Sequence, residues 1–104
     1  MKTLKNGEDF NLADYEAALA KLRAQIDAVD QALAQHLVHR LQLADEIGRL
    51  KASTGQLEMS ETRQAQILAQ LAAQFPELDQ VEIAAVWQIL FGLSIARQLT
   101  IMNK

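Results

Sequence analysis

Apolar residues that recur at alternating steps of three and four run from Leu12 to Leu50, and this repeat restricts the chain to a helical fold. Its members are Leu12, Tyr15, Leu19, Leu22, Ile26, Val29, Leu33, Leu43, Ile47 and Leu50. Such spacing is typical of the dry face that one helix turns toward another. The same repeat passes through positions 36 and 40, where the chain has His36 and Arg40.

Arg40 is the least expected residue on this apolar face, because its side chain is charged. A guanidinium keeps its charge at every physiological pH, so burying it without a partner is costly. Either a carboxylate of the protein pairs with Arg40, or its long stem carries the charge out of the face, or an anionic ligand meets it. Lys51 lies eleven residues on, close to the same side of the helix, whereas Asp45 and Glu46 fall on other sides. The pattern therefore favours a small anionic ligand.

Composition narrows the class of protein. The 104 residues include no cysteine, which excludes a disulfide framework and cysteine-based chemistry. A net charge of −3 with dispersed basic residues disfavours nucleic-acid binding. We find no secretory signal and no run of about 18 apolar residues, so we expect a cytoplasmic protein with no membrane partner. His36 and His39 lack a third ligand, and no metal site is expected.

Local signals predict three helices in one domain spanning residues 1–104, with residues 1–10 flexible. Asn11 is a candidate N-cap for a helix that runs to about Lys51. A loop over 53–59 follows, and Ser60 can cap a second helix that carries Arg63 and ends at Pro76. Asp79 and Glu82 have the spacing of a capping box. The third helix would present Ile83, Trp87, Leu90 and Ile101, with Ser94 and Gln98 inside that stripe. The fold class is all-α.

The length of the first helix predicts a dimer. A helix over 12–51 is about 58 Å long at about 1.5 Å per residue, whereas a compact monomer of this size has a radius of gyration of about 13 Å. Two shorter helices cannot cover such a rod. We therefore expect an intertwined two-fold homodimer built around the long helices.

Several short motifs taken together resemble the all-helical chorismate mutase family, over about residues 19 to 98. Each motif is weak alone, and their joint spacing is specific. The residues that carry the resemblance are Leu22-Arg23 with Ile26-Asp27 and Asp30, then Arg40, Ile47-Gly48 with Lys51, Arg63, and Ser94 with Gln98. The resemblance implies an intertwined three-helix dimer with two active sites.

The resemblance also implies residue roles. Arg40, Arg63 and Lys51 of one chain would bind the carboxylates and ether oxygen of a dicarboxylate substrate, Ser94 would help to hold a carboxylate, and Gln98 would donate to the ether oxygen. Arg23 would come from the partner chain, since about 25 Å of rigid helix separates it from Arg40. The expected catalytic residues are Lys51, Gln98 and Arg40, and no cofactor or metal is required.

Two positions depart from the family pattern. Gln64 stands where a glutamate is usual, and Ser60 where an aspartate is frequent, both near the substrate's ring hydroxyl in the family. The expected activity is the rearrangement of chorismate to prephenate in aromatic amino-acid biosynthesis. The departures keep two related activities open: an isochorismate pyruvate lyase, and a mutase for an amino analogue of chorismate. A non-catalytic dimerisation or regulatory module is the alternative outside enzymes.

Overall fold

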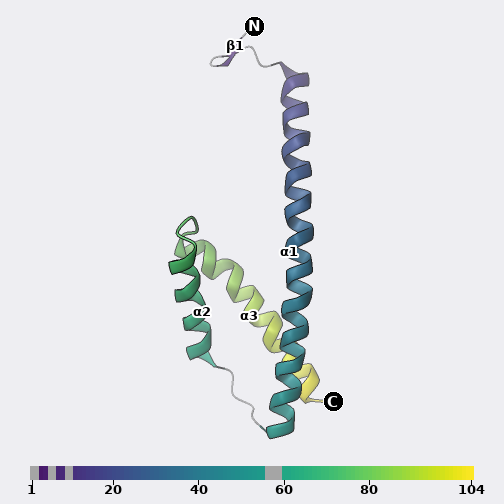
Figure 1. The fold of residues 1–104 in the computed structure, drawn as a ribbon, viewed down its shortest axis with the longest axis vertical. Helices are drawn as coiled ribbons and strands as arrows, with labels where there is room; N and C mark the ends of the chain where they lie inside the picture. Colours follow the sequence, from purple (N-terminus) through teal and green to yellow (C-terminus); the bar gives the residue numbers. More distant parts are fainter. Residues whose placement is uncertain (1–2, 5–6, 9–10, 56–59) are drawn as a thin grey trace. The chain divides into compact units, whose positions relative to one another are not determined.

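Three helices make up most of the chain. The computed structural model describes residues 3–4, 7–8, 11–55 and 60–104. The helices are α1 (Leu12–Thr54), α2 (Glu61–Gln74) and α3 (Gln80–Met102), drawn in Figure 1. Before them, β1 (Thr3–Leu4) pairs antiparallel with β2 (Gly7–Glu8), which the sequence patterns did not predict. The all-α class with a long first helix is confirmed.

The chain divides into two compact units, and the boundary falls inside α1. Unit 1 comprises Met1–Leu37 and therefore holds the N-terminal part of α1. Unit 2 comprises Val38–Lys104 and holds the C-terminal part of α1 with all of α2 and α3. Most of the predicted site residues belong to unit 2.

Each helix begins at the residue that the sequence predicted as its cap. The backbone N–H of Asp14 donates to Oδ1 of Asn11 at 2.8 Å. Ser60 caps α2, and Asp79 with Glu82 forms a complete capping box at the start of α3. These side chains accept backbone N–H groups that have no partner inside the helix.

The first helix ends three residues later than predicted. The hydroxyls of Ser53 and Thr54 both donate to the carbonyl of Leu50, so the backbone stays helical through Thr54. Gly55 then adopts a φ of +75°, which favours glycine and ends the helix. The rest of the predicted 53–59 loop lies outside the described residues. The second helix ends at Gln74, just before Pro76, as expected.

The core of unit 2 forms where α3 meets the C-terminal part of α1, a contact visible in Figure 1. Its buried residues are Ala44 and Gly48 on α1 and Phe91, Ser94 and Gln98 on α3. Ile83, also buried, lies near the start of α3 and lines a cavity together with Leu68 and Ala72 of α2. Each residue of the expected stripe on α3 is buried or half-buried, and Phe91, which the expected stripe left out, is buried as well. Leu90 and Phe91 follow Trp87 by three and four residues, so the helical spacing is compatible with burial of either one.

The apolar repeat of α1 is not the face that packs against α3. Leu43, Ile47 and Leu50 are 47, 44 and 65% exposed, whereas the neighbouring face with Ala44 and Gly48 is buried. In unit 1 the repeat is exposed as well, for example Leu12 at 70% and Leu33 at 60%, except for Leu19, which is half-buried. Arg40 and Lys51 are half-buried. One chain therefore leaves most of this apolar repeat in water.

The third helix is long and apolar enough to cross a membrane, by length and composition alone, with a mean hydropathy of 1.3. The expectation that no segment reaches this level was wrong. Core helices of water-soluble domains meet the same criterion. In this chain 11% of the apolar window is buried, and three polar side chains of α3, Ser94, Arg97 and Gln98, bond to side chains of α1.

Candidate active site

Arg40 reaches from α1 to α3 and is held there by neutral groups. Its Nη1 donates to the hydroxyl of Ser94 and, at 3.5 Å, to the carbonyl oxygen of Leu90. The guanidinium carbon lies 5.9 Å from the centre of the Phe91 ring, within the range of a cation–π contact. Ser94 is 9% exposed. These contacts fix the guanidinium without neutralising its charge.

A second cation lies close enough to act on Arg40. Burial lowers the pKa of the Arg40 guanidinium, and the positive charge of Arg63 lowers it further. Both effects disfavour the charged form. Within the described part of the chain, no carboxylate lies within ion-pair distance of Arg40 or Arg63. An internal Arg–Glu pair is therefore excluded among these residues, and an anion would find two cations together.

Lys51 and Gln98 form the other half of this cluster. The Nζ of Lys51 donates to Oε1 of Gln98 at 3.0 Å, and Gln98 is 8% exposed. Because the carbonyl oxygen of the amide accepts this bond, the two N–H groups of the same amide remain on its other side as donors. The pair therefore joins an ammonium and an amide donor in a partly buried place.

Gly48 lies at a close approach of α1 and α3 in this cluster. A Cβ at this position would lie 3.0 Å from Cα and 3.1 Å from the carbonyl oxygen of Gln98, and 3.1 Å from Cβ of Ile101. These distances are shorter than almost all contacts that real Cβ atoms make. The absence of a side chain therefore permits the close approach of the two helices.

Three predicted residues stand in the first turn of α2. Ser60 accepts the backbone N–H of Arg63 at 3.0 Å, so its hydroxyl oxygen helps to form the helix that carries Arg63. The side chain of Arg63 is exposed, and Gln64 is half-buried. Ser60 thus acts as a cap in this chain, and its predicted role as a substrate contact stays a prediction, as does that of Gln64.

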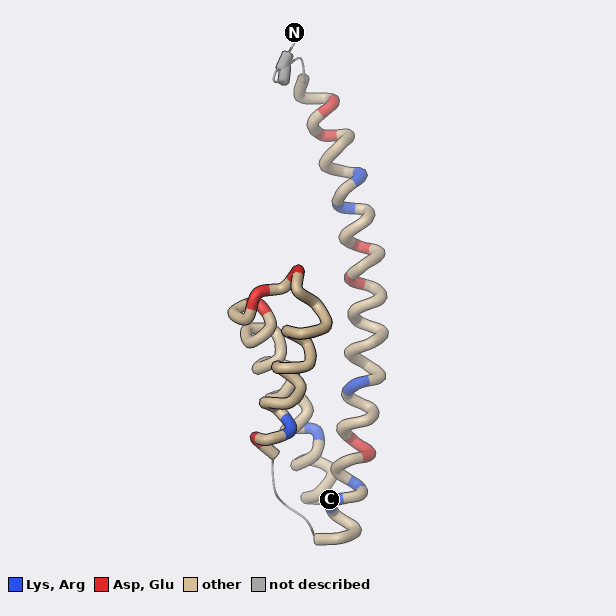
Figure 2. Tube along the Cα trace, turned by 60° about the vertical axis from the view of Figure 1, so that its left-hand side comes forward, with Lys and Arg blue, Asp and Glu red and all other residues tan. Residues whose placement is uncertain are grey.

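An ion pair closes the outer side of the α1–α3 contact. Arg97 donates from Nε and Nη2 to the two carboxylate oxygens of Asp45, both at 2.9 Å. The bond from Arg97 is the main cause that holds the pKa of the Asp45 carboxyl below its usual value. Figure 2 shows basic segments on all three helices toward the end of unit 2 where α1 ends, and acidic segments at the α2–α3 turn.

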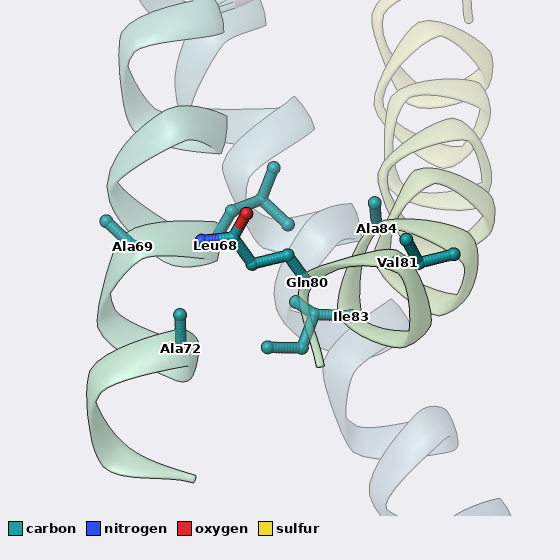
Figure 3. A pocket seen from close by; sticks show the side chains of 7 residues that line it. All are labelled: Leu68, Ala69, Ala72, Gln80, Val81, Ile83 and Ala84. Atoms are coloured by element: carbon teal, nitrogen blue, oxygen red, sulfur yellow. The ribbon is translucent and has the colours of Figure 1, made fainter. Parts of the chain in front are cut away.

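A cavity of about 410 Å³ opens between α2 and α3 (Figure 3). Its lining comprises Leu68, Ala69, Ala72, Gln80, Val81, Ile83 and Ala84. Gln80 is the one polar residue among them, and none is charged. A dianion would lose its hydration there without gaining a partner, so the cation cluster, rather than this cavity, is the candidate active site.

The structure brings four predicted residues together in two bonded pairs, Arg40 with Ser94 and Lys51 with Gln98. The resemblance had placed Lys51 and Gln98 at one substrate oxygen, whereas the bond between Arg40 and Ser94 was not predicted. Arg63 belongs to the same group because its positive charge lowers the pKa of Arg40. Arg23 lies exposed on the part of α1 in unit 1, so its placement stays a prediction.

Sequence patterns did not identify Phe91 or Arg97 as neighbours of the cluster. They also did not show that Gly48 lies at a close contact between the two helices. Phe91 was detectable, since it stands three residues before Ser94 and shares its side of the helix.

Comparison with known protein families identifies one match. A family model described as chorismate mutase type II covers residues 22–99, a span that holds every predicted site residue from Arg23 to Gln98. Comparisons with curated proteins and with solved structures gave no match.

Proposed function

Because the chain belongs to the chorismate mutase type II family, we propose that it catalyses the [3,3] rearrangement of chorismate to prephenate. The reaction is unimolecular and needs neither a nucleophile nor an obligatory proton transfer. A catalyst must hold a dianion in a folded, chair-like conformer and stabilise the negative charge that grows on the breaking ether bond. Positioning and preorganised charge supply both. The proposal places the protein in cytoplasmic aromatic amino-acid biosynthesis.

The Arg40–Arg63 pair supports binding of the dianion. Burial and the charge of Arg63 both disfavour the charged form of Arg40, and an anion beside Arg40 would offset both effects. Planar guanidinium groups also match the geometry of carboxylates. Ser94 is already bonded to Arg40, which keeps a hydroxyl beside the guanidinium. We assign one substrate carboxylate to Arg40 with Ser94 and the other to Arg63 with a cation of the partner chain.

The bond from Lys51 to Gln98 is the observation that carries the proposal. It holds an ammonium and an amide N–H donor together before any substrate arrives, so the donors need no rearrangement when charge develops on the ether oxygen. We assign that oxygen to these two residues.

We further propose that the active unit is a homodimer in which Arg23 of one chain completes the site of the other. The exposed repeat of α1 supports this assembly, because a run of apolar residues from Leu12 to Leu50 left in water favours association with a second helix. Arg23 and Arg40 are seventeen residues apart on one uninterrupted helix, about 25 Å at about 1.5 Å per residue, which is too far for one small substrate.

Gln64 favours a second candidate activity. An isochorismate pyruvate lyase, or a mutase acting on an amino analogue, would use the same dicarboxylate site without a carboxylate aimed at a 4-hydroxyl. The neutral amide of Gln64 is compatible with either. A non-catalytic dimerisation or regulatory module would predict carboxylates paired with Arg40, and its neutral partners among the described residues count against that alternative.

The test is an assay of the purified protein with chorismate and with isochorismate in parallel. Formation of prephenate from chorismate, with little pyruvate from isochorismate, is the expected result. Pyruvate release from isochorismate alone would favour the lyase. No turnover of either substrate, by a protein that is helical and dimeric, would contradict the proposed enzyme class.

A further inference from the structure

Gly48 touches the backbone of the residue that the proposed mechanism depends on. The nearest atoms to a Cβ at this position belong to Gln98, its Cα and its carbonyl oxygen, and these are not parts of a flexible side chain. A side chain at position 48 can therefore be accommodated only if α3 moves away from α1. We propose that Gly48 is a positioning residue, whose missing side chain sets the distance at which Gln98 meets Lys51.

The Lys51–Gln98 bond is sensitive to that distance. Lys51 follows Gly48 by three residues on α1, and the two therefore share a side of the helix. A Cβ added at Gly48 would meet the backbone of Gln98, and Lys51 donates to the side chain of the same residue at 3.0 Å. A shift of α3 by the few tenths of an ångström that a Cβ requires would lengthen or misalign this bond, and hydrogen bonds weaken steeply with poor geometry.

The inference rests on the proposed function, and the chain contains its own matched control. Gly92 lies on α3, and a Cβ added there meets nothing within 4 Å. Gly48→Ala and Gly92→Ala are thus the same chemical change, at a close helix contact and in open space. Misplacement of a catalytic group by about 1 Å can cost roughly 10²-fold in rate. For Gly48→Ala we expect kcat to fall by about tenfold with little change in KM, and for Gly92→Ala no change.

A double-substitution cycle separates positioning from a general loss of structure. If Gly48 acts through Gln98, then Gly48→Ala should lower kcat by less than about twofold when Gln98 is already alanine. An equal loss with and without Gln98, or an unchanged kcat in a folded Gly48→Ala protein, would overturn the proposal. If Gly48→Ala alone does not fold, the change is made together with Gly92→Ala, whose gain in helix propensity offsets part of the loss.

A measurement independent of activity distinguishes this inference from the proposed function. The side-chain amide signal of Gln98 can be identified in an NMR spectrum of the ¹⁵N-labelled protein by its disappearance in Gln98→Ala. We expect this signal to shift in Gly48→Ala toward its position in Lys51→Ala, and to stay unchanged in Gly92→Ala. An unshifted signal in Gly48→Ala would overturn the positioning role even if the protein proved inactive toward every substrate tested.

Discussion

Lys51 donates a hydrogen bond to Oε1 of Gln98 at 3.0 Å, although the two residues are 47 positions apart in the chain. The bond joins α1 to α3. Gly48, three residues before Lys51, lies at a close contact of the same two helices. Since most hydrogen bonds of side chains go to the backbone or to water, a bond between two functional side chains on different helices indicates a prearranged pair. The first predictions concern this pair and the second chain that would complete its site.

Lys51→Ala should lower kcat for chorismate by about 10²-fold or more, the usual scale for losing a donor to a developing oxyanion. The protein should stay folded, because the substitution removes a partly buried charge. Steady-state kinetics and circular dichroism check the two statements. Arg49→Ala, an exposed cation two residues earlier, is the matched control and should keep near-normal kcat. Near-normal kcat in Lys51→Ala would remove Lys51 from the mechanism.

The unmodified protein should sediment at micromolar concentration with about twice the mass of one chain. The physical reason is the apolar repeat of α1, most of whose described side chains are exposed. Sedimentation equilibrium measures this mass directly. A stable, helical monomer would contradict the dimer and, with it, the role of Arg23 across the interface.

Mixing two inactive variants should restore part of the activity. Arg23→Ala and Lys51→Ala each damage every site in their own homodimer. A mixed dimer has one site built from the intact Lys51 chain and the intact Arg23 of its partner, so up to about half of the mixed dimers' sites work. The activity of a refolded mixture, compared with each variant refolded alone, checks this. No recovery in a mixture shown to contain mixed dimers would place Arg23 outside the shared site.

The Asp45–Arg97 pair predicts a pH dependence of stability. The bond from Arg97 holds the folded-state pKa of the Asp45 carboxyl below its ordinary value. A depressed carboxyl pKa stabilises the fold above the unfolded-state pKa of about 3.9, and that contribution is lost as pH falls through the folded-state pKa.

Arg97→Gln should therefore lower Tm at neutral pH, and the difference from the unmodified protein should vanish at strongly acidic pH. Thermal melts followed by circular dichroism between pH 7 and the acid limit measure this difference. Glu46→Gln, which alters an exposed carboxylate beside the pair, serves as a control. A difference that persists undiminished at the lowest pH would mean that Arg97 stabilises the fold through packing rather than through Asp45.

Local signals made the ends of the helices predictable, and non-local contacts remained hidden. Asn11, Ser60 and Asp79 are caps because each accepts a hydrogen bond from the backbone N–H three residues later, a spacing that a sequence shows directly. The Asp45–Arg97 pair joins residues 52 positions apart, and no local pattern reveals such a partner. The sequence indicated that Asp45 lies on a different side of the helix from Arg40. It did not indicate that Asp45 pairs with Arg97.

The candidate site was predictable for a different reason. Arg40, Lys51, Ser94 and Gln98 interrupt apolar faces, and a polar residue in such a place requires a partner. The interruptions identified the residues, and the resemblance assigned Lys51 and Gln98 to one substrate oxygen. The structure shows Lys51 bonded to Gln98, and it also shows Arg40 bonded to Ser94, a pair that the resemblance had not named. Gly48 was judged only by its low helix propensity, because a close contact depends on how two helices cross.

Gln64→Glu decides between the two candidate substrates. A carboxylate at this position would accept a hydrogen bond from the neutral 4-hydroxyl of chorismate, and a charge-assisted bond is roughly twice as strong as a neutral one. If chorismate is the substrate, the change should lower KM by a few-fold. Gln66→Glu, an exposed position two residues later on α2, controls for the added charge.

If the true substrate lacks the 4-hydroxyl, as isochorismate does, the new carboxylate gains no hydrogen bond and stands near a dianion. Two anions a few ångströms apart in a partly buried site repel each other more strongly than they would in water, so binding should weaken. The quantity to compare is kcat/KM for chorismate in Gln64→Glu relative to Gln66→Glu. A rise supports the mutase. A fall would count against chorismate as the substrate and favour the lyase or the amino-analogue mutase, because the neutral amide of Gln64 would then be the group suited to the site.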